Sequence, residues 1–187
     1  FIDKSGHVII PLKYDSVESD GGLIKLEYNG KYGFIDREGN EVVPLKYDLA
    51  GFFYKGLARV KSNNKYGFID REGNEVVPLQ YDDTNNFFEG LAPVGSKGKY
   101  GFINKEGNVV VPLKYDCADN FSGGLAKVKL NDKYGFINKE GNEVVPLKYD
   151  YADNFSKGLS LVKLNGKYGF IDKSGHVIIP LKYDSVE

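Results

Sequence analysis

The sequence predicts an all-β protein made of five tandem repeats. Three observations carry this prediction. The tetrapeptide Lys-Tyr-Gly-Phe returns at a fixed spacing, and the pentapeptide Pro-Leu-Lys/Gln-Tyr-Asp follows it in step. No window of ten or more residues has the apolar spacing of a helix. Short runs rich in Val, Ile, Tyr and Phe are instead broken at regular intervals by Gly and Asn, which is typical of strands joined by tight turns.

The spacing of these motifs defines the repeat. The first motif begins at Lys31 and again at Lys65, so the period is 65 − 31 = 34 residues. We divide the chain into one repeat domain, 1–187, with repeats 1–33, 34–67, 68–101, 102–135 and 136–169 and a partial repeat 170–187. The first repeat is one residue shorter. It lacks the aromatic of Phe53, Phe87, Phe121 and Phe155, with Ser19 or Asp20 in its place.

The two ends of the chain are identical. Residues 1–18 and residues 170–187 both read FIDKSGHVIIPLKYDSVE. Removing one copy leaves 187 − 18 = 169 residues, which is 33 + 4 × 34. Three explanations stay open: a deliberate duplication, one period of a longer natural array, or a recent duplication. No initiating Met and no signal peptide are visible, which is expected of a mature chain, a fragment or an engineered protein.

One repeat, followed from Gly56, is predicted to hold three or four strands. In order we expect a strand at 57–61, a turn at 62–64, a strand at 66–70, a hairpin turn at 71–74, a strand at 75–77, an edge segment at 79–82 and a loop at 83–89. Gly73 supplies the positive φ of the hairpin turn. Pro78 has no N–H to donate, so we expect regular pairing to end there.

A three-stranded sheet of this size is not stable alone in water, so each repeat must bury its apolar side chains against its neighbours. Five repeats predict a propeller-like ring of antiparallel meanders. The alternative is an open β-solenoid or superhelix. It is favoured by the partial repeat 170–187, which has no place in a ring that residues 1–18 already fill.

Charge and composition exclude several classes of function. Lys plus Arg number 25 and Asp plus Glu 26, which argues against a nucleic-acid-binding protein. The apolar runs are too short to insert in a membrane. One Cys forms no internal disulfide and no multi-cysteine zinc site. A single thiol is compatible with any compartment, although the tyrosine-rich repeats favour secretion or a bacterial cell surface over the cytoplasm.

The two motifs resemble those of the bacterial WG-repeat (KWG) family, over the whole chain. In that family the repeat reads approximately G-L-A-x-V, a turn, K-W-G-F-I-D, x-x-G, then V-I-P-x-x-Y-D. Tyr stands here in place of the family's Trp, at Tyr32, Tyr66, Tyr100, Tyr134 and Tyr168. The resemblance implies β-rich repeat material that acts as an interaction module, and it brings no catalytic residues.

The residue types that could carry catalysis or bind a metal are better explained by structural roles. His7 and His176 are the same position in the duplicated ends and are expected to be solvated turn residues. Cys117 has no His in its own repeat or the next and is expected to be structural or incidental. Asp or Asn recurs at one position of each repeat: Asp36, Asp70, Asn104, Asn138 and Asp172. Because either residue type occurs there, a side chain that hydrogen-bonds its own turn explains the position better than calcium binding does. We expect no enzyme activity, no cofactor and no metal.

In a repeat protein, binding residues are expected at positions whose residue type differs between repeats, because the constant positions maintain the fold. The hairpin tips supply the candidates Lys31, Lys65, Lys99, Lys133, Lys167, Asn63, Asn64, Asn131 and Asn165. A second variable zone follows each Tyr-Asp, at 49–54, 83–88, 117–120 and 151–154. The alternative is that the lysines only keep strand edges soluble. Constant motif residues are expected to be structural: the five tyrosines named above, Pro44, Pro78, Pro112, Pro146, Tyr47, Asp48, Tyr81 and Asp82.

Three functions follow as hypotheses. The first is a non-enzymatic repeat scaffold that binds a protein partner. The second is a structural subunit that assembles with itself through the duplicated ends. The third is a multivalent carbohydrate-binding module with one weak glycan site per repeat.

Overall fold

The computed structural model describes residues 5–6 and 13–186 of the chain. Every regular element among these residues is a β-strand, and no helix there is long and apolar enough to cross a membrane. The chain divides into two compact parts, Phe1–Asn86 and Phe87–Glu187. We call them the N-terminal lobe and the C-terminal lobe and describe each by itself.

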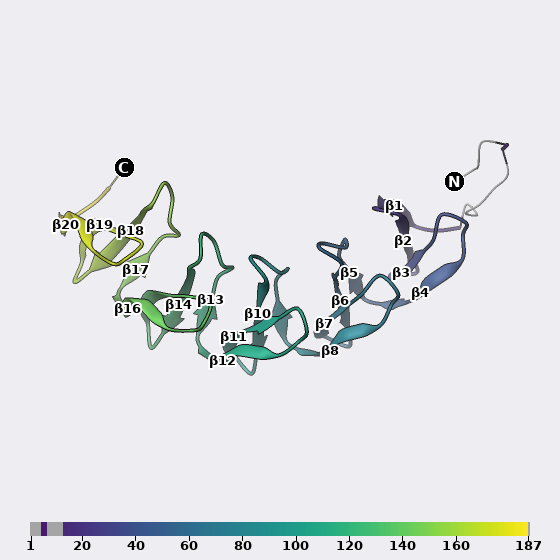
Figure 1. Ribbon diagram of the computed structural model, residues 1–187, viewed down its shortest axis with the longest axis horizontal. Coiled ribbons are helices and arrows are strands. Elements are labelled where there is room, and N and C mark those ends of the chain that lie inside the picture. Colours follow the sequence, from purple (N-terminus) through teal and green to yellow (C-terminus); the bar gives the residue numbers. More distant parts are fainter. Residues whose placement is uncertain (1–4, 7–12, 187) are drawn as a thin grey trace. The chain divides into compact units, whose positions relative to one another are not determined.

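The N-terminal lobe holds two four-stranded antiparallel sheets whose strands follow one another in sequence order (Figure 1). The first sheet contains β1 (Ser16–Asp20), β2 (Leu23–Tyr28), β3 (Lys31–Ile35) and β4 (Glu41–Tyr47). The second contains β5 (Leu49–Ala50), β6 (Ala58–Ser62), β7 (Lys65–Ile69) and β8 (Glu75–Tyr81). The short strand β9 (Asp83–Thr84) ends the lobe.

The C-terminal lobe repeats the same meander. Its strands are β10 (Leu91–Ser96), β11 (Lys99–Asn104) and β12 (Val109–Tyr115). A four-stranded sheet follows with β13 (Cys117–Ala118), β14 (Ala126–Leu130), β15 (Lys133–Ile137) and β16 (Glu143–Tyr149). The last sheet contains β17 (Tyr151–Ala152), β18 (Leu159–Leu164), β19 (Lys167–Asp172) and β20 (Val177–Tyr183).

The predicted turns are present and explain the Gly and Asn content. Gly73 has a φ of 87° in the β7–β8 hairpin, and Asn63 and Asn64 have φ of 50° and 60° in the β6–β7 hairpin. Glycine and asparagine adopt this left-handed region at the least cost. The strands therefore begin and end within a residue or two of their predicted positions for most of the repeat.

The expectation that regular pairing ends at Pro78 is confirmed, and the edge segment predicted after it continues the strand, because β8 extends to Tyr81. The register shifts between β7 and β8, with Tyr66 opposite Tyr81 and Phe68 opposite Val77. Pro78 lies in this bulge, where extra residues of β8 are left unpaired and need no ladder N–H. The proline therefore bends the edge strand without ending it.

The glycine of Lys-Tyr-Gly lies against the same bulge. A Cβ on Gly67 would lie 2.4 Å from the carbonyl oxygen of Val77 and 2.9 Å from the carbonyl carbon of Pro78. Only a residue without a side chain lets the two backbones approach this closely. The two motifs are thus parts of one structural feature, and Gly33, Gly101, Gly135 and Gly169 repeat it.

The core lies between consecutive sheets of a lobe. In the N-terminal lobe Phe34, Val43 and Tyr47 of the first sheet pack against side chains of the second: Ala50, Phe53, Ala58, Val60 and Ile69. In the C-terminal lobe Phe102, Val111 and Tyr115 pack in the same way against Phe121, Ala126, Val128 and Ile137. Stacking is therefore what buries the apolar face of each sheet, as the repeat pattern predicts.

Two features of this core are polar. The hydroxyl oxygens of Tyr47 and Tyr115 are buried and have no hydrogen-bond partner among the described residues. In the first sheet the buried Asp20 stands at the position of the repeated Phe, and its carboxylate accepts the N–H of Phe53 at 2.7 Å. The hydrogen bond of Asp20 therefore joins the first two sheets beside the ring contact between Phe34 and Phe53.

Candidate functional site

Each lysine of the Lys-Tyr-Gly motif forms an ion pair with the aspartate of the following Tyr-Asp. The pairs are Lys31–Asp48, Lys65–Asp82, Lys99–Asp116, Lys133–Asp150 and Lys167–Asp184. The strand register brings them together, because β3 pairs with β4 so that Tyr32 lies opposite Tyr47, one residue from each partner. Equivalent registers hold the later pairs.

The second oxygen of the aspartate holds the hairpin tip of the next sheet. The N–H of Asn63 donates to Asp48 at 2.9 Å, and the N–H of Asn131 donates to Asp116 at 2.8 Å. Asn165 and Asp150 repeat the bond at 2.7 Å. Each of these aspartates therefore joins a lysine of its own sheet to the backbone of the next one.

These contacts change how the carboxylates titrate. The ion pair with Lys99, together with the N–H of Asn131, holds the pKa of Asp116 below its ordinary value. Lys31 and Lys133, with the hairpin-tip N–H groups, lower the pKa of Asp48 and Asp150 in the same way. Both contacts favour the charged form of the carboxyl group. These aspartates are therefore ionised well below neutral pH.

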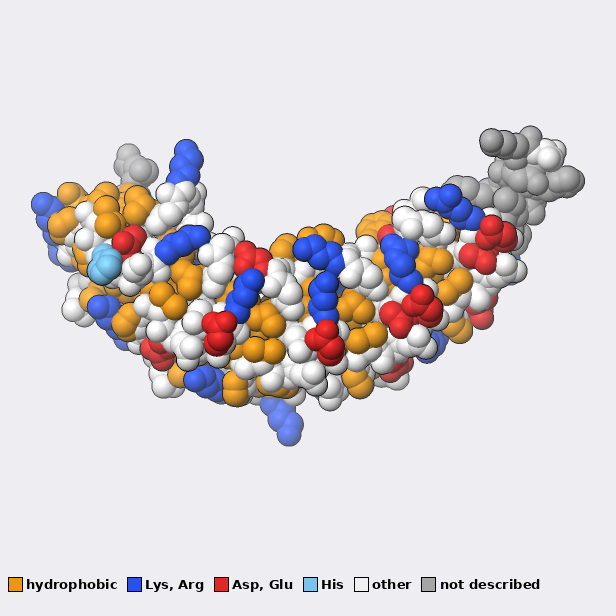
Figure 2. All heavy atoms as spheres, in the orientation of Figure 1, with side chains coloured by type: hydrophobic (Ala, Val, Ile, Leu, Met, Phe, Trp, Pro, Cys, Tyr) orange, Lys and Arg blue, Asp and Glu red, His pale blue; other side chains and the backbone are white. Residues whose placement is uncertain are grey.

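The candidate lysines are not a row of unpaired cations. All five are in these ion pairs, and the candidate Asn63, Asn131 and Asn165 donate backbone N–H groups to the same aspartates. Figure 2 shows basic and acidic side chains interleaved on the visible face. Asn64 lies next to Asn63 in the same turn and is not one of the residues named for these contacts with the aspartates. A binding role for these residues stays a prediction.

The tyrosines of four Lys-Tyr-Gly motifs, Tyr32, Tyr66, Tyr134 and Tyr168, each lie under a basic side chain. The ammonium nitrogen of Lys61 is 5.0 Å from the centroid of the Tyr66 ring, and that of Lys163 is 4.7 Å from the Tyr168 ring. Lys25 and Lys129 approach Tyr32 and Tyr134 in the same way, at 5.9 Å and 5.4 Å. These rings are half-buried and covered by a cation, which is a packing arrangement.

The other polar candidates have local roles. Asp36 accepts the N–H of Asn40 at 2.7 Å, and Asn104 accepts the N–H of Asn108 at 2.8 Å, so the Asx-turn prediction is confirmed. His176 is exposed and lies 3.3 Å from Asp172, while His7 lies outside the described residues. Cys117 is an exposed residue with a free thiol, and partial desolvation of the thiol and nearby Asp119 raise its pKa. Within the described residues no cluster of His, Cys, Asp or Glu side chains is arranged to hold a metal ion.

Two exposed aromatic rings in the N-terminal lobe form a different kind of surface. Phe52 is 50% exposed and Tyr54 is 45% exposed, in the loop between β5 and β6. The ammonium nitrogen of Lys25 lies 4.1 Å from the Phe52 ring centroid, and that of Lys55 lies 5.4 Å from the Tyr54 centroid. We call these four residues the aromatic patch.

Phe52 and Tyr54 lie in the predicted variable zone 49–54, but neither ring was named as a candidate binding residue. Phe52 corresponds to Asn86, Asn120 and Asn154 in later repeats, and Tyr54 corresponds to Phe88, Ser122 and Ser156. No later repeat has an aromatic at the first position and only one has it at the second, so neither ring is a requirement of the repeated core. This departure from the repeat was the signal that could have identified both rings.

Comparison with known proteins gives a family and a fold. The family model of the WG containing repeat matches residues 1–32, 32–66, 66–100, 100–134, 134–168 and 168–187. A comparison with curated proteins gives no match.

Solved structures are similar in fold at very low sequence identity. A eukaryotic initiation factor matches with a TM-score of 0.55 and 11% identity, over 93% of this chain and 54% of that chain. Hsv2 of Kluyveromyces lactis matches with a TM-score of 0.51 and 8% identity, over 87% of this chain and 60% of that one. The chain thus spans less than two thirds of either structure. These neighbours are β-propeller-like, so the prediction of an all-β, propeller-like fold is confirmed. Ring closure stays a prediction.

The repeated Lys-Tyr-Gly and Tyr-Asp motifs, their shared bulge and the six consecutive matches lead to one assignment. The chain belongs to the WG-repeat family.

Proposed function

We propose that this chain is a non-enzymatic repeat scaffold that mediates protein–protein interaction. The observation that carries the proposal is the aromatic patch, in which Phe52 and Tyr54 stay exposed while the repeated aromatics Phe34, Tyr47 and Phe53 of the same lobe are buried. Repeat proteins hold a constant frame and place specificity in residues that differ between repeats. Exposed aromatic anchors are enriched at the centres of protein interfaces.

The chemistry of the patch indicates the partner. Lys25 lies beside Phe52, and Lys55 lies beside Tyr54 and adds positive charge to the apolar area. Lys25 also pairs with Glu18 at 2.5 Å, which fixes its position beside Phe52. A peptide segment with an apolar side chain next to Asp or Glu would complement both features.

The repeated polar residues support a role without catalysis. Five of the aspartates that follow a repeated Tyr pair with lysines, and Asp48, Asp116 and Asp150 also hold hairpin tips. The acids and amides at the second set of positions bond their own turns. Groups engaged in this way maintain the frame, while general acid–base catalysis needs a group within reach of a substrate proton.

The test selects peptides from a random library displayed on phage, with the 187-residue chain immobilised. We expect selected peptides to carry an aromatic or aliphatic residue flanked by acids and to bind at one site by calorimetry. Phe52→Ala should weaken binding by about tenfold or more, as expected of an anchor residue. The control Phe88→Ala removes an exposed ring of the other lobe and should leave the affinity unchanged.

Two outcomes would contradict the proposal. One is that no peptide is selected, or that the selected peptides bind Phe52→Ala and the unchanged chain equally well. The other is that a glycan array, probed with the same two proteins, shows glycan binding that depends on Phe52 while no peptide binds. That result would identify a carbohydrate-binding module.

A further inference from the structure

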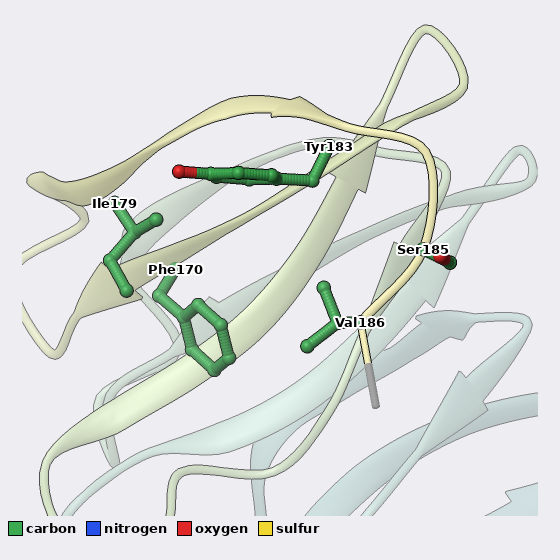
Figure 3. Close-up of a pocket in the computed structure, with 5 residues that line it drawn as sticks. All are labelled: Phe170, Ile179, Tyr183, Ser185 and Val186. Atoms are coloured by element: carbon green, nitrogen blue, oxygen red, sulfur yellow. The ribbon is translucent and has the colours of Figure 1, made fainter.

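A pocket of about 250 Å³ on the last sheet is lined by Phe170, Ile179, Tyr183, Ser185 and Val186. Figure 3 shows that Phe170, Ile179 and Val186 point toward the same space, with the ring of Tyr183 lying across it. None of the five side chains is charged at neutral pH, so the pocket offers a ligand apolar contacts and two hydroxyl groups. Groups that could bind an anion lie instead in the turns that precede the long strands.

These turns place two consecutive residues in the left-handed region. In the C-terminal lobe Gly123 and Gly124 have φ of 60° and 85°, and in the N-terminal lobe Lys55 and Gly56 have φ of 50° and 89°. In both turns the two flanking residues exchange backbone hydrogen bonds with each other. The two turns therefore have the same backbone conformation and present the same pair of N–H groups.

In the C-terminal lobe this pair of N–H groups binds a carboxylate. Gly123 donates to one oxygen of Glu89 at 2.6 Å, and Gly124 donates to the other at 3.0 Å. The ammonium nitrogen of Lys139 lies 3.2 Å from the second oxygen. Desolvation would raise the pKa of Glu89, but these three contacts outweigh it and hold the pKa below its ordinary value. Two successive turn N–H groups and a cation thus form an anion-binding site.

The N-terminal lobe has the same donors without the glutamate. The corresponding residues stand two repeats, or 89 − 21 = 68 residues, earlier in the chain: Gly21 for Glu89, Lys55 for Gly123, Gly56 for Gly124 and Arg71 for Lys139. No acceptor among the described residues bonds the N–H groups of Lys55 and Gly56, and no described carboxylate pairs with Arg71. Asp20 precedes Gly21, but its carboxylate is buried and accepts the N–H of Phe53.

Arg71 is held beside this turn. Its Nη1 donates to the carbonyl oxygen of Gly21 at 3.1 Å, and its Cζ lies 4.9 Å from the centroid of the Phe53 ring. A Cβ on Gly21 would lie 3.1 Å from Nη2, so the guanidinium borders the place from which a glutamate side chain would extend. A guanidinium has five donors in one plane and binds a carboxylate through two parallel bonds.

A second turn of this kind is less suited to bind an anion. Lys157 and Gly158 have φ of 50° and 85° in the last sheet, and Gly123 stands where Glu89 stands one repeat earlier. The cation there is Lys173, which already donates to the carbonyl oxygen of Gly123 at 3.1 Å. An ammonium group lacks the planar pair of donors that a guanidinium presents to a carboxylate. The turn beside Arg71 is therefore the stronger site.

We propose that the N–H groups of Lys55 and Gly56, together with the guanidinium of Arg71, bind the carboxylate of an acidic side chain on the protein partner. The turn directly follows Tyr54, and Lys55 belongs to the aromatic patch, so an apolar residue and a neighbouring acid of one peptide can reach both. The identity of the partner rests on the proposed function. The carboxylate site itself rests on the correspondence with Glu89.

The first test titrates the isotope-labelled 187-residue chain with sodium acetate, against sodium chloride at equal ionic strength, and follows the amide resonances by NMR. We expect acetate alone to shift the resonances of Lys55 and Gly56 to saturation. Arg71→Gln removes the guanidinium and should weaken the apparent affinity at least about fivefold. The control Arg37→Gln removes the corresponding arginine of the first sheet and should leave the affinity unchanged.

The C-terminal turn supplies an internal comparison. Gly123 and Gly124 already bind Glu89, so acetate should not shift their resonances, whereas in Glu89→Gly it should. A Glu89→Gly chain whose two glycines stay unresponsive overturns the proposal. So does the absence of a saturating shift at Lys55 and Gly56, or equal affinity of Arg71→Gln and the unchanged chain for acetate.

The second test supplies the carboxylate from the chain itself. Gly21 has a φ of 53° and Glu89 a φ of 51°, so Gly21→Glu suits the backbone. We expect the introduced carboxyl group to titrate below the ordinary glutamate pKa of about 4.3 and to abolish the acetate response of Lys55 and Gly56. An ordinary pKa for the introduced group would show that these donors do not bind a carboxylate.

Peptides selected on the chain separate this inference from the proposed function. Arg71→Gln should weaken their binding at least about fivefold, and exchanging their acids for amides should remove the difference between the two proteins. Peptides that bind both proteins equally well would leave the aromatic patch as their site and overturn the assignment of the acid. If no peptide is selected, the proposed function fails, and the acetate titration still decides whether the carboxylate site exists.

Discussion

The buried carboxylate of Asp20 accepts a hydrogen bond from the backbone N–H of Phe53, with 2.7 Å between the nitrogen and the oxygen. Asp20 is the last residue of β1, and Phe53 follows β5, so the bond joins the two sheets of the N-terminal lobe. The guanidinium of Arg71 reaches the same place and donates to the carbonyl oxygen of Gly21 at 3.1 Å. These polar contacts hold the two sheets together in addition to the ring contact between Phe34 and Phe53.

The first prediction concerns this bond. Asp20→Ala leaves the N–H of Phe53 buried without an acceptor, and we expect the free energy of unfolding to fall by about 1–3 kcal/mol. Urea denaturation measures the change. Asp20→Asn keeps an acceptor oxygen and should recover part of the loss. Equal losses of unfolding free energy in the two variants would show that the carboxylate stabilises the protein by something other than this hydrogen bond.

The second prediction concerns the bulge opposite Lys-Tyr-Gly. Gly67→Ala would place its Cβ 2.4 Å from the carbonyl oxygen of Val77, so the two strands must separate. We expect a loss of about 1–3 kcal/mol in the free energy of unfolding, typical of overpacking. Gly51→Ala is the matched control, since its Cβ would lie 3.5 Å from the nearest atom. A tolerated Gly67→Ala would show that the bulge is not constrained by this contact.

The third prediction is a dependence of stability on acid pH. The pKa values of Asp48, Asp116 and Asp150 are lowered in the folded state, so the unfolded chain binds protons at a higher pH than the folded one. Their contribution to stability is complete above the ordinary aspartate pKa of about 3.9 and is lost as the pH falls through the lower folded values. The thermal midpoint should therefore be steady from neutral pH to about pH 5 and fall below about pH 4.

Asp116→Asn isolates one member of this set. The variant loses one proton-linked step, so its midpoint should fall less steeply with acid than that of the unchanged chain. Lys99→Gln removes the partner and should flatten the same limb. Lys105→Gln changes an equal charge in the following hairpin turn, leaves the Lys99–Asp116 pair in place, and serves as the control. Identical acid limbs for all four proteins would rule out the ion pair as the cause.

The fourth prediction concerns the buried hydroxyl of Tyr115. Its oxygen has no hydrogen-bond partner among the described residues, and the ring is fully buried in the C-terminal lobe. Tyr115→Phe removes an unsatisfied polar group, and we expect the free energy of unfolding to stay unchanged or to rise by up to about 1 kcal/mol. Calorimetric unfolding measures it. A loss of more than about 1 kcal/mol would show that the hydroxyl is bonded in solution, to a water molecule for instance.

Much of the local structure could be predicted from the sequence. Gly73 and Asn63 mark turns because few residues adopt positive φ at low cost, and this requirement does not depend on distant contacts. Asp36 bonds its own turn for a similarly local reason. The break in regular pairing at Pro78 follows from its missing N–H, but the bulge itself depends on how closely Gly67 lets the neighbouring strand approach.

Less of the candidate site could be predicted from the sequence, because its contacts join residues that are far apart in the chain. Lys99 and Asp116 are 17 residues apart, and their ion pair exists because β11 and β12 pair in one register. The sequence listed the lysines as candidates for binding without this partner. Phe52 and Phe53 are adjacent and alike in type, yet one is half exposed and the other is buried in the core.

The sequence by itself determined the repeat, the all-β class, the turns and the family resemblance, because periodic motifs and backbone preferences are properties of short segments. The tertiary structure decided which equal residues are buried. Tyr115 and Tyr183 occupy the same position of the same motif, but a following sheet covers Tyr115 and none of the described residues covers Tyr183 to that extent. Burial is set by the neighbour that a sheet acquires on folding, and one repeat read alone does not contain that neighbour.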